Sequence, residues 1–192
     1  MNKISTPVEE SFFQRDNTMI YYHGLYKGKL REFILSYKFR NHHSLAREFS
    51  QMLYETIRNQ SIYFDIITYV PATKSAKHKR GYDHMRLIAK QLSKLTNKPY
   101  INLLLAVRET DQLKTENRQE AVKGKFKINE QKLKNLIKEK SEHLNTREKI
   151  EKKKILLIDD VYTTGSTIKE CINTLKISGL ENIIVLVIAM NN

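Results

Sequence analysis

Cysteine is almost absent from this sequence. Cys171 is the only one among 192 residues. A single cysteine excludes an internal disulfide and a zinc site built from clustered cysteines. Because chains without disulfides suit a reducing compartment, we expect an intracellular, cytoplasmic protein.

The sequence also lacks long apolar runs. Its first residues, MNKISTPVEESFF, contain no apolar signal core, and no apolar run approaches ~18 residues. We therefore expect neither secretion nor a membrane span. Only three prolines and a hydrophobic content of 40% indicate a globular fold. The length suits one ordinary domain with a small appendage.

Acidic residues are outnumbered. The chain has 34 Lys and Arg against 21 Asp and Glu, which gives a net charge of +13. Such an excess suggests polyanionic partners, either nucleic acid or phosphorylated small molecules. A basic proteome or a solubility bias would leave the same excess, so charge alone does not identify the partner.

Apolar runs typical of strands alternate along the chain with segments whose apolar residues recur at helical spacing. Residues 28–59 predict two helices that break near residues 40–44. Strands are predicted at FDIITYVP, INLLLAVRET, ILLIDD and IIVLVIA, with helices before the second and fourth of them. The basic stretch ATKSAKHKRG is expected to be a loop. This alternation predicts an α/β fold with a mainly parallel sheet and helices on both faces.

The domain boundaries follow from composition. Residues 1–20 are polar and irregular, and we predict an N-terminal arm there, with one domain over residues 21–192. Residues 127–154 hold ten Lys and Arg and five Glu with few large apolar groups. We expect this segment to be an exposed, charged insertion with a short amphipathic helix.

The most informative stretch is ILLIDDVYTTGST, residues 155–167. In an open parallel sheet, ligands bind beyond the carboxyl ends of the strands. Gly165 lets the backbone approach an anion, and hydroxyls and free amides at a helix N-terminus surround phosphate. The phosphate-binding residues predicted here are Thr163, Thr164, Gly165, Ser166 and Thr167.

Two carboxylates precede this turn. Asp159 and Asp160 cannot bind phosphate directly, but they can accept hydrogen bonds from vicinal ribose hydroxyls, directly or through a hydrated Mg²⁺. The motif therefore predicts a ribose 5-phosphate site. A Walker B strand is a weaker alternative, because the nearest P-loop candidate, GLYKGK, is one residue short. The acids could also merely cap a turn.

ILLIDDVYTTGST resembles the phosphoribosyl pyrophosphate (PRPP) motif of type I phosphoribosyltransferases. The segments YHGLYKGKLREFILSYKFRNHHSLA, ITYVPATKSAKHKRGYDHM and RETDQLKTENRQEAVKGKF resemble, in that order, segments of the ComF family. ComF proteins are competence-associated, amidophosphoribosyltransferase-like proteins of bacteria. The resemblance runs from about residue 22 to residue 189.

The resemblance implies roles for individual residues. Mg²⁺ would be the cofactor, reached through Asp159, Asp160 and the substrate without a complete protein ligand set. The pyrophosphate loop would contain Lys74, Lys77 and Arg80, and a flexible loop would contain Arg108, Gln112 and Arg118. The implied catalytic residues are Asp159, Asp160 and Arg80, because cations stabilise a departing pyrophosphate.

The sequence departs from the family at several places: Ala121 stands where an Asn is expected after the loop arginine, and the segment 127–154 is longer than the family connection. The sequence also has RGYDH where ComF proteins usually show RGFNQ, and it lacks their N-terminal four-cysteine zinc element. His78 and His84 lie near the predicted site, but we expect both at the surface.

Two functions stay open. The resemblance implies a competence protein that handles incoming single-stranded DNA beside a helicase-like partner. The alternative is an active phosphoribosyltransferase whose acceptor is a nucleobase or an amine.

Overall fold

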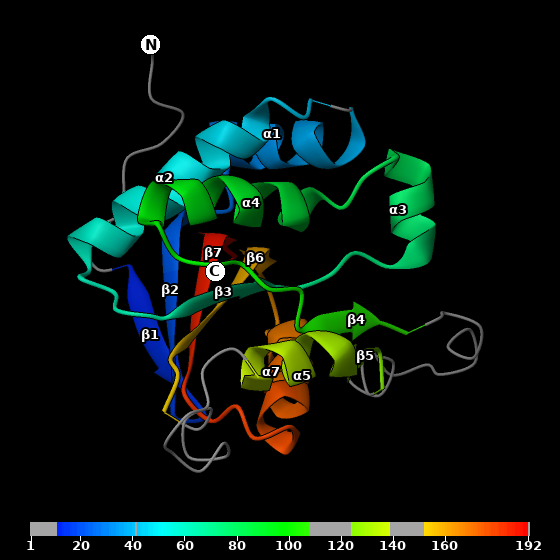
Figure 1. The fold of residues 1–192 in the computed structure, drawn as a ribbon. Coiled ribbons are helices and arrows are strands. Elements are labelled where there is room, and N and C mark those ends of the chain that lie inside the picture. Colours follow the sequence, from blue (N-terminus) through cyan, green and yellow to red (C-terminus); the bar gives the residue numbers. More distant parts are fainter. Residues whose placement is uncertain (1–10, 41, 108–123, 139–151, 192) are drawn as a thin grey trace.

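A five-stranded sheet forms the centre of the molecule. The computed structural model describes residues 11–40, 42–107, 124–138 and 152–191. The sheet order is β1-β2-β7-β6-β3, built from Phe12–Arg15, Thr18–Leu25, Ile183–Met190, Ile155–Tyr162 and Ile66–Tyr69. Only β1 and β2 pair antiparallel; the other neighbours are parallel. The α/β fold with a mainly parallel sheet is confirmed (Figure 1).

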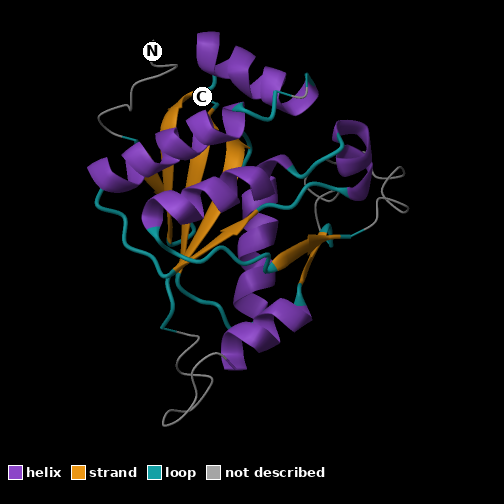
Figure 2. Ribbon diagram, turned by 45° about the horizontal axis from the view of Figure 1, so that its top comes forward, coloured by secondary structure: helices purple, strands orange, loops and turns teal. Residues whose placement is uncertain are grey.

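Helices cover both faces of this sheet (Figures 1 and 2). One face packs against α1 (Gly28–Phe39), α2 (Leu45–Asn59) and α4 (His84–Thr96). The other face packs against α5 (Glu130–Lys138) and α7 (Ser166–Ile177). Successive strand side chains point to opposite faces, so Leu157 joins the core under α7 and Ile158 joins the core under α4. Both are fully buried, which explains why β6 reads as a continuous apolar run.

A small antiparallel hairpin lies beside the main sheet. β4 (Leu104–Ala106) pairs with β5 (Phe126–Ile128). The strand predicted over INLLLAVRET is therefore limited to three residues. The segment predicted as a charged insertion contains α5, whose Leu136 is buried against the core. Residues 139–151 lie outside the described residues.

The basic stretch after β3 is a helix, and the prediction of a loop was wrong. α3 spans Lys74–Arg80. The Thr73 hydroxyl caps it by accepting from the amide of Ala76 at 3.2 Å. Gly81 ends it in the left-handed conformation at φ 77°. Alanine, lysine and arginine favour helix, and these two caps make even a seven-residue helix form.

The N-terminal segment takes part in the sheet. Residues 12–15, within the predicted arm, form the edge strand β1, and β2 begins at Thr18. Within the described part of the chain, no helix is long and apolar enough to cross a membrane.

Two loops leave the sheet at the same edge. Tyr69 of β3 pairs with Ile158 of β6, and the amide of Val70 donates to the Ile158 carbonyl at 3.1 Å. β3 ends there, whereas β6 continues to Tyr162. The residues that follow Val70 and those at the end of β6 therefore meet at the carboxyl edge, where open parallel sheets bind ligands.

Candidate functional site

The turn between β6 and α7 has the backbone form that an anion site needs. Gly165 is the N-cap of α7 and has φ 76°. Thr163 and Thr164 are exposed, and Ser166 is half-buried. The hydroxyls of Thr164 and Ser166 lie 2.9 Å apart, so they form one polar cluster at the helix N-terminus. The structure thus brings the predicted phosphate-binding residues together around the first turn of α7.

The two aspartates before this turn point to opposite faces of the sheet. Asp160 lies on the face of Ile158, toward α1 and α4, and Asp159 lies on the face of Leu157, toward α7. Their exposed fractions are only 8% and 7% for Asp159 and Asp160. Asp159 Oδ1 accepts from the amide of Asp160 at 2.9 Å. A ligand above the end of β6 can be reached from both sides of the strand.

Asp160 is held by two cationic or polar partners from distant segments. Its Oδ2 lies 2.7 Å from Nζ of Lys38, on α1, and 2.6 Å from Nε2 of His84, on α4. His84 Nδ1 in turn lies 3.1 Å from Nη1 of Arg80. The Tyr37 hydroxyl donates to the His84 carbonyl at 2.7 Å, which fixes the start of α4. Arg80, His84, Asp160 and Lys38 form one connected polar network.

The two carboxyl groups have opposite pKa shifts. Burial, together with the charge of Asp160, raises the pKa of Asp159 well above its usual value. Burial acts on Asp160 in the same direction, but Lys38 and the hydrogen bond from His84 outweigh it and hold the pKa of Asp160 below its usual value. Burial would lower the pKa of Lys38, yet Asp160 keeps that pKa raised. The surroundings therefore favour the charged form of Asp160 and disfavour that of Asp159.

The sequence did not reveal Lys38 and His84 as partners of Asp160. His84 was expected at the surface, and this expectation was wrong, because the residue is 6% exposed and faces the carboxylate. His84 and Asp160 are 76 residues apart, so no local spacing connects them. The available signal was the position of His84 in RGYDH, directly after the predicted pyrophosphate loop.

The predicted pyrophosphate residues all lie on α3, and their surroundings differ. Lys74 is exposed. Lys77 Nζ forms an ion pair with Asp83 Oδ2 at 3.0 Å. The Arg80 guanidinium lies 5.5 Å from the centre of the Phe39 ring and contacts His84. Arg80 is thus the one of the three that is linked to the acid pair. Arg108, Gln112 and Arg118 of the predicted flexible loop lie outside the described residues.

The acid pair does not form a complete metal site. No group of three or more His, Cys, Asp or Glu side chains that could hold an ion occurs among the described residues. One oxygen of each carboxylate, Asp159 Oδ2 and Asp160 Oδ1, has no hydrogen-bond partner within the described ranges. These oxygens fit a Mg²⁺ whose other ligands are substrate oxygens and water, because Mg²⁺ usually keeps several such ligands.

Comparison with known proteins gives a family match. The family model described as phosphoribosyl transferase domain matches residues 79–192, which include the acids and the turn. Competence protein F of Haemophilus influenzae is 28% identical over 169 residues, which cover 83% of this chain and 67% of that protein.

Two solved structures are also similar. The Bacillus subtilis glutamine PRPP amidotransferase, complexed with ADP and GMP, is 17% identical with a TM-score of 0.49. An allosteric regulatory enzyme of purine biosynthesis is 18% identical with a TM-score of 0.47. Each match covers 80% of this chain, but the chain spans only 30% and 29% of those two proteins.

Proposed function

Because the chain belongs to the phosphoribosyl transferase domain family, we propose that it binds the ribose 5-phosphate part of a PRPP-type ligand. The turn from Thr163 to Thr167 holds the 5-phosphate, and Asp159 and Asp160 accept the ribose hydroxyls. One observation carries this proposal: the acids lie near the carboxyl end of a buried strand, and Gly165 is the N-cap of the following helix in the left-handed conformation. A phosphate and a diol are then bound at adjacent positions on one strand-to-helix connection.

The diol meets an acid pair that is already partly occupied. Lys38 and His84 hold Asp160 Oδ2, so the ligand uses the remaining oxygens, Asp160 Oδ1 and Asp159 Oδ2. Because both side chains are more than nine-tenths buried, the ligand enters by displacing the neighbours that cover them. Lys38 then stays near the bound sugar and offsets the negative charge of the pair.

Mg²⁺ is the cofactor that we propose for the site. When bound, it neutralises charge on a pyrophosphate group. In this chain Asp159 and Asp160 would hold it, with the substrate supplying further oxygens. Their role is to orient the ribose and to fix the position of the ion, whereas the helix α3, which follows β3, offers cations.

We propose that the protein acts as a ComF-like competence protein in the uptake or processing of single-stranded DNA. Its similarity to competence protein F supports this role. The net charge of +13 suits a phosphate backbone. Phe39 is 68% exposed between basic residues, and such an aromatic can stack on a base. A helicase-like competence partner belongs to the same proposal.

Catalytic phosphoribosyl transfer is the second candidate function. The contact between Arg80 and His84 supports it, because this contact joins the cationic α3 to the acid pair. A cation beside the ribose can stabilise a departing pyrophosphate, and the reaction needs little acid–base assistance. A pyrophosphate-release assay over nucleobase and amine acceptors separates this candidate from a binding role.

Calorimetry with PRPP and Mg²⁺ tests the proposed site. We expect Asp159→Asn to weaken PRPP affinity about tenfold or more, because a charge-assisted hydrogen bond to the ribose is lost. Asp65→Asn is the matched control. Asp65 accepts from the amide of Lys154 at the opposite end of β6, so this variant removes the same charge away from the turn. We expect its PRPP affinity to equal that of the wild type.

Two results would contradict the proposal. The first is an Asp159→Asn variant that binds PRPP as tightly as the wild type. The second is an equal loss of affinity in both variants, which would indicate a general charge effect and not a ribose contact.

A further inference from the structure

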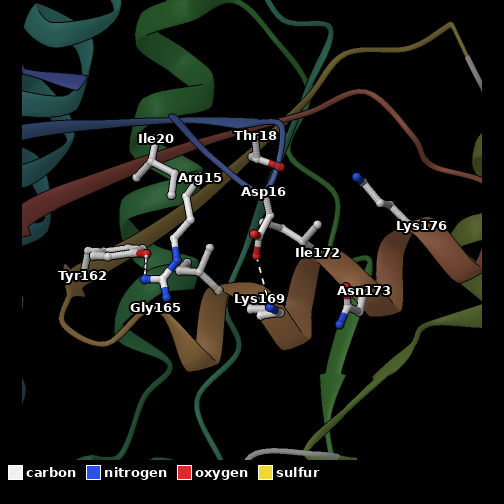
Figure 3. A pocket seen from close by; sticks show the side chains of 11 residues that line it. Arg15, Asp16, Thr18, Ile20, Tyr162, Gly165, Lys169, Ile172, Asn173 and Lys176 are labelled. Atoms are coloured by element: carbon white, nitrogen blue, oxygen red, sulfur yellow. Dashed lines mark hydrogen bonds and ion pairs between the residues drawn. The ribbon is translucent and has the colours of Figure 1, made fainter. Parts of the chain in front are cut away.

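The turn of the β1–β2 hairpin touches the outer side of the predicted phosphate turn. A cavity of about 220 Å³ lies between this hairpin and α7, and Arg15, Tyr162, Gly165 and Lys169 are among its lining residues (Figure 3). Asp16 and Lys169 form an ion pair across it at 3.1 Å. This pair is exposed, and exposed pairs contribute little to stability. The informative contacts are those of Arg15.

Arg15 binds two groups of the β6–α7 connection at once. Its Nη1 donates to the hydroxyl of Tyr162 at 2.8 Å and to the carbonyl oxygen of Thr164 at 3.1 Å. Arg15 and Thr164 are 149 residues apart, and β1 joins the two segments through its place at the sheet edge. A single guanidinium therefore fixes the direction of the peptide bond between Thr164 and Gly165.

The direction of the Thr164–Gly165 peptide bond decides where the Gly165 N–H points. The described chain contains no cis peptide bond. In a trans peptide the C=O and the following N–H point in opposite directions. Since the Thr164 carbonyl points to Arg15 on the hairpin side, the Gly165 N–H points away from the hairpin. A phosphate bound on that side of the turn would receive a hydrogen bond from this amide.

The Tyr162 ring lies directly against Gly165 in the turn. A Cβ built on Gly165 would fall on the phenol group of Tyr162, so glycine is needed for space as well as for its φ of 76°. Phe13 of β1 packs edge-on against the Tyr162 ring, with ring centroids 5.2 Å apart. Two β1 residues, Phe13 and Arg15, thus hold the ring on which Gly165 rests.

We propose that Arg15 is a positioning residue for the phosphate-binding turn. It orients the Gly165 amide toward the 5-phosphate without touching the ligand. The inference rests on the proposed function, since it assumes that the turn binds phosphate. It gives the N-terminal hairpin a role in ligand affinity in addition to its place in the sheet.

Titration with ribose 5-phosphate and with inorganic phosphate tests this role. We expect Arg15→Gln to weaken both affinities about five- to tenfold, because the orientation of one amide hydrogen bond is lost. Lys176→Gln is the matched control, because Lys176 lines the same cavity and carries the same charge but makes no contact with the turn within the described residues. Its affinities should equal those of the wild type.

A second readout separates positioning from loss of fold. In ¹⁵N–¹H spectra, we expect the Gly165 amide of Arg15→Gln to shift without ligand and to respond less to phosphate, while the melting temperature stays near the wild-type value. Tyr162→Phe, which removes one acceptor of Arg15 and keeps the ring, should change the affinities in the same direction.

The outcomes distinguish this inference from the proposed function. Wild-type protein that binds neither probe contradicts the proposed function and this inference with it. Wild-type protein that binds, together with Arg15→Gln that binds equally well, overturns the inference alone. Equal weakening by Lys176→Gln also overturns it, because charge and not orientation would then explain the loss.

Discussion

Asp159 and Asp160 are adjacent, yet their environments make opposite contributions to stability. Asp160 is paired with Lys38 and His84, so its pKa is lowered in the folded state. Asp159 is buried beside another carboxyl group, so its pKa is raised. A charge that is paired in the folded state stabilises it, whereas a buried charge with a raised pKa destabilises it. Substitution of the two residues is therefore expected to change the free energy of unfolding in opposite directions.

At neutral pH we expect Asp160→Asn to lower the free energy of unfolding by about 3 kcal/mol, because Lys38 loses its buried partner. Asp159→Asn should instead raise it, since the charged form of a buried carboxyl group is removed. Thermal and urea unfolding measure both effects. Shifts of the same sign in the two variants would contradict the opposite environments of the two carboxyl groups.

The pH dependence has a defined sign for each residue. The stabilisation from Asp160 is complete above the unfolded pKa of about 3.9, and it is lost as the pH falls toward the lowered folded value. Asp160→Asn should therefore lose less stability in acid than the wild type. The cost of Asp159 is present above its raised folded pKa and disappears below the unfolded value, so the advantage of Asp159→Asn should shrink as the pH falls. Unfolding curves check both trends when they extend from pH 7 down to about pH 2, because the loss for Asp160 begins only below its unfolded pKa.

At the scale of elements, local motifs were easier to predict than contacts between segments. ILLIDDVYTTGST contains its own strand, turn and helix start, and the structure has β6, Gly165 and α7 there. Arg15, Lys38 and His84 contact this segment from three other elements. No spacing within the local sequence therefore predicts these contacts. The helix α3 was missed because the many cations suggested a loop, although Thr73 and Gly81 are suitable caps.

The end of α1 and the end of α3 lie against each other, and this is the surface that we propose for single-stranded DNA. The Arg80 guanidinium lies over the Phe39 ring, and Arg40 follows Phe39 in the sequence. We expect Phe39→Ala to weaken binding of a single-stranded oligonucleotide about fivefold or more, because stacking on one aromatic is lost. Fluorescence anisotropy at fixed salt measures this change.

Ile177→Ala is the control for this experiment. Ile177 is 88% exposed and ends α7, on the other face of the sheet. This variant should bind the oligonucleotide as the wild type does. If both variants bind as the wild type does, or lose affinity equally, the surface around Phe39 is not the DNA site.

At the scale of the whole molecule, the fold was predictable because the spacing of apolar residues along the sequence distinguishes strands from helices. Apolar strands at FDIITYVP, ILLIDD and IIVLVIA alternate with amphipathic helices, and the structure has β3, β6 and β7 as parallel neighbours. The N-terminal hairpin of FFQR and TMIYYHGL was not predicted, because it joins the sheet through the pairing of its second strand, β2, with β7, far along the chain. Net charge indicated a polyanionic partner but did not identify it.

The sheet order explains why one edge carries the site. β3 and β6 are neighbours, so the α3 cations, which follow β3, lie at the same edge of the sheet as the acid pair in β6 and the phosphate turn after it. The α1 and α4 residues Lys38 and His84 reach the same edge from one face, and Arg15 reaches the turn from β1. The family match covers β6, α7 and β7 but not the β1–β2 hairpin that contains Arg15.

A crystal structure with ribose 5-phosphate bound would test the central claim most directly. We expect the phosphate within hydrogen-bond distance of the amides of residues 163–167. The ribose hydroxyls should contact the carboxylates of Asp159 and Asp160. A phosphate bound elsewhere, for example along the cations of α3, with Asp160 still contacting only Lys38 and His84, would contradict the account.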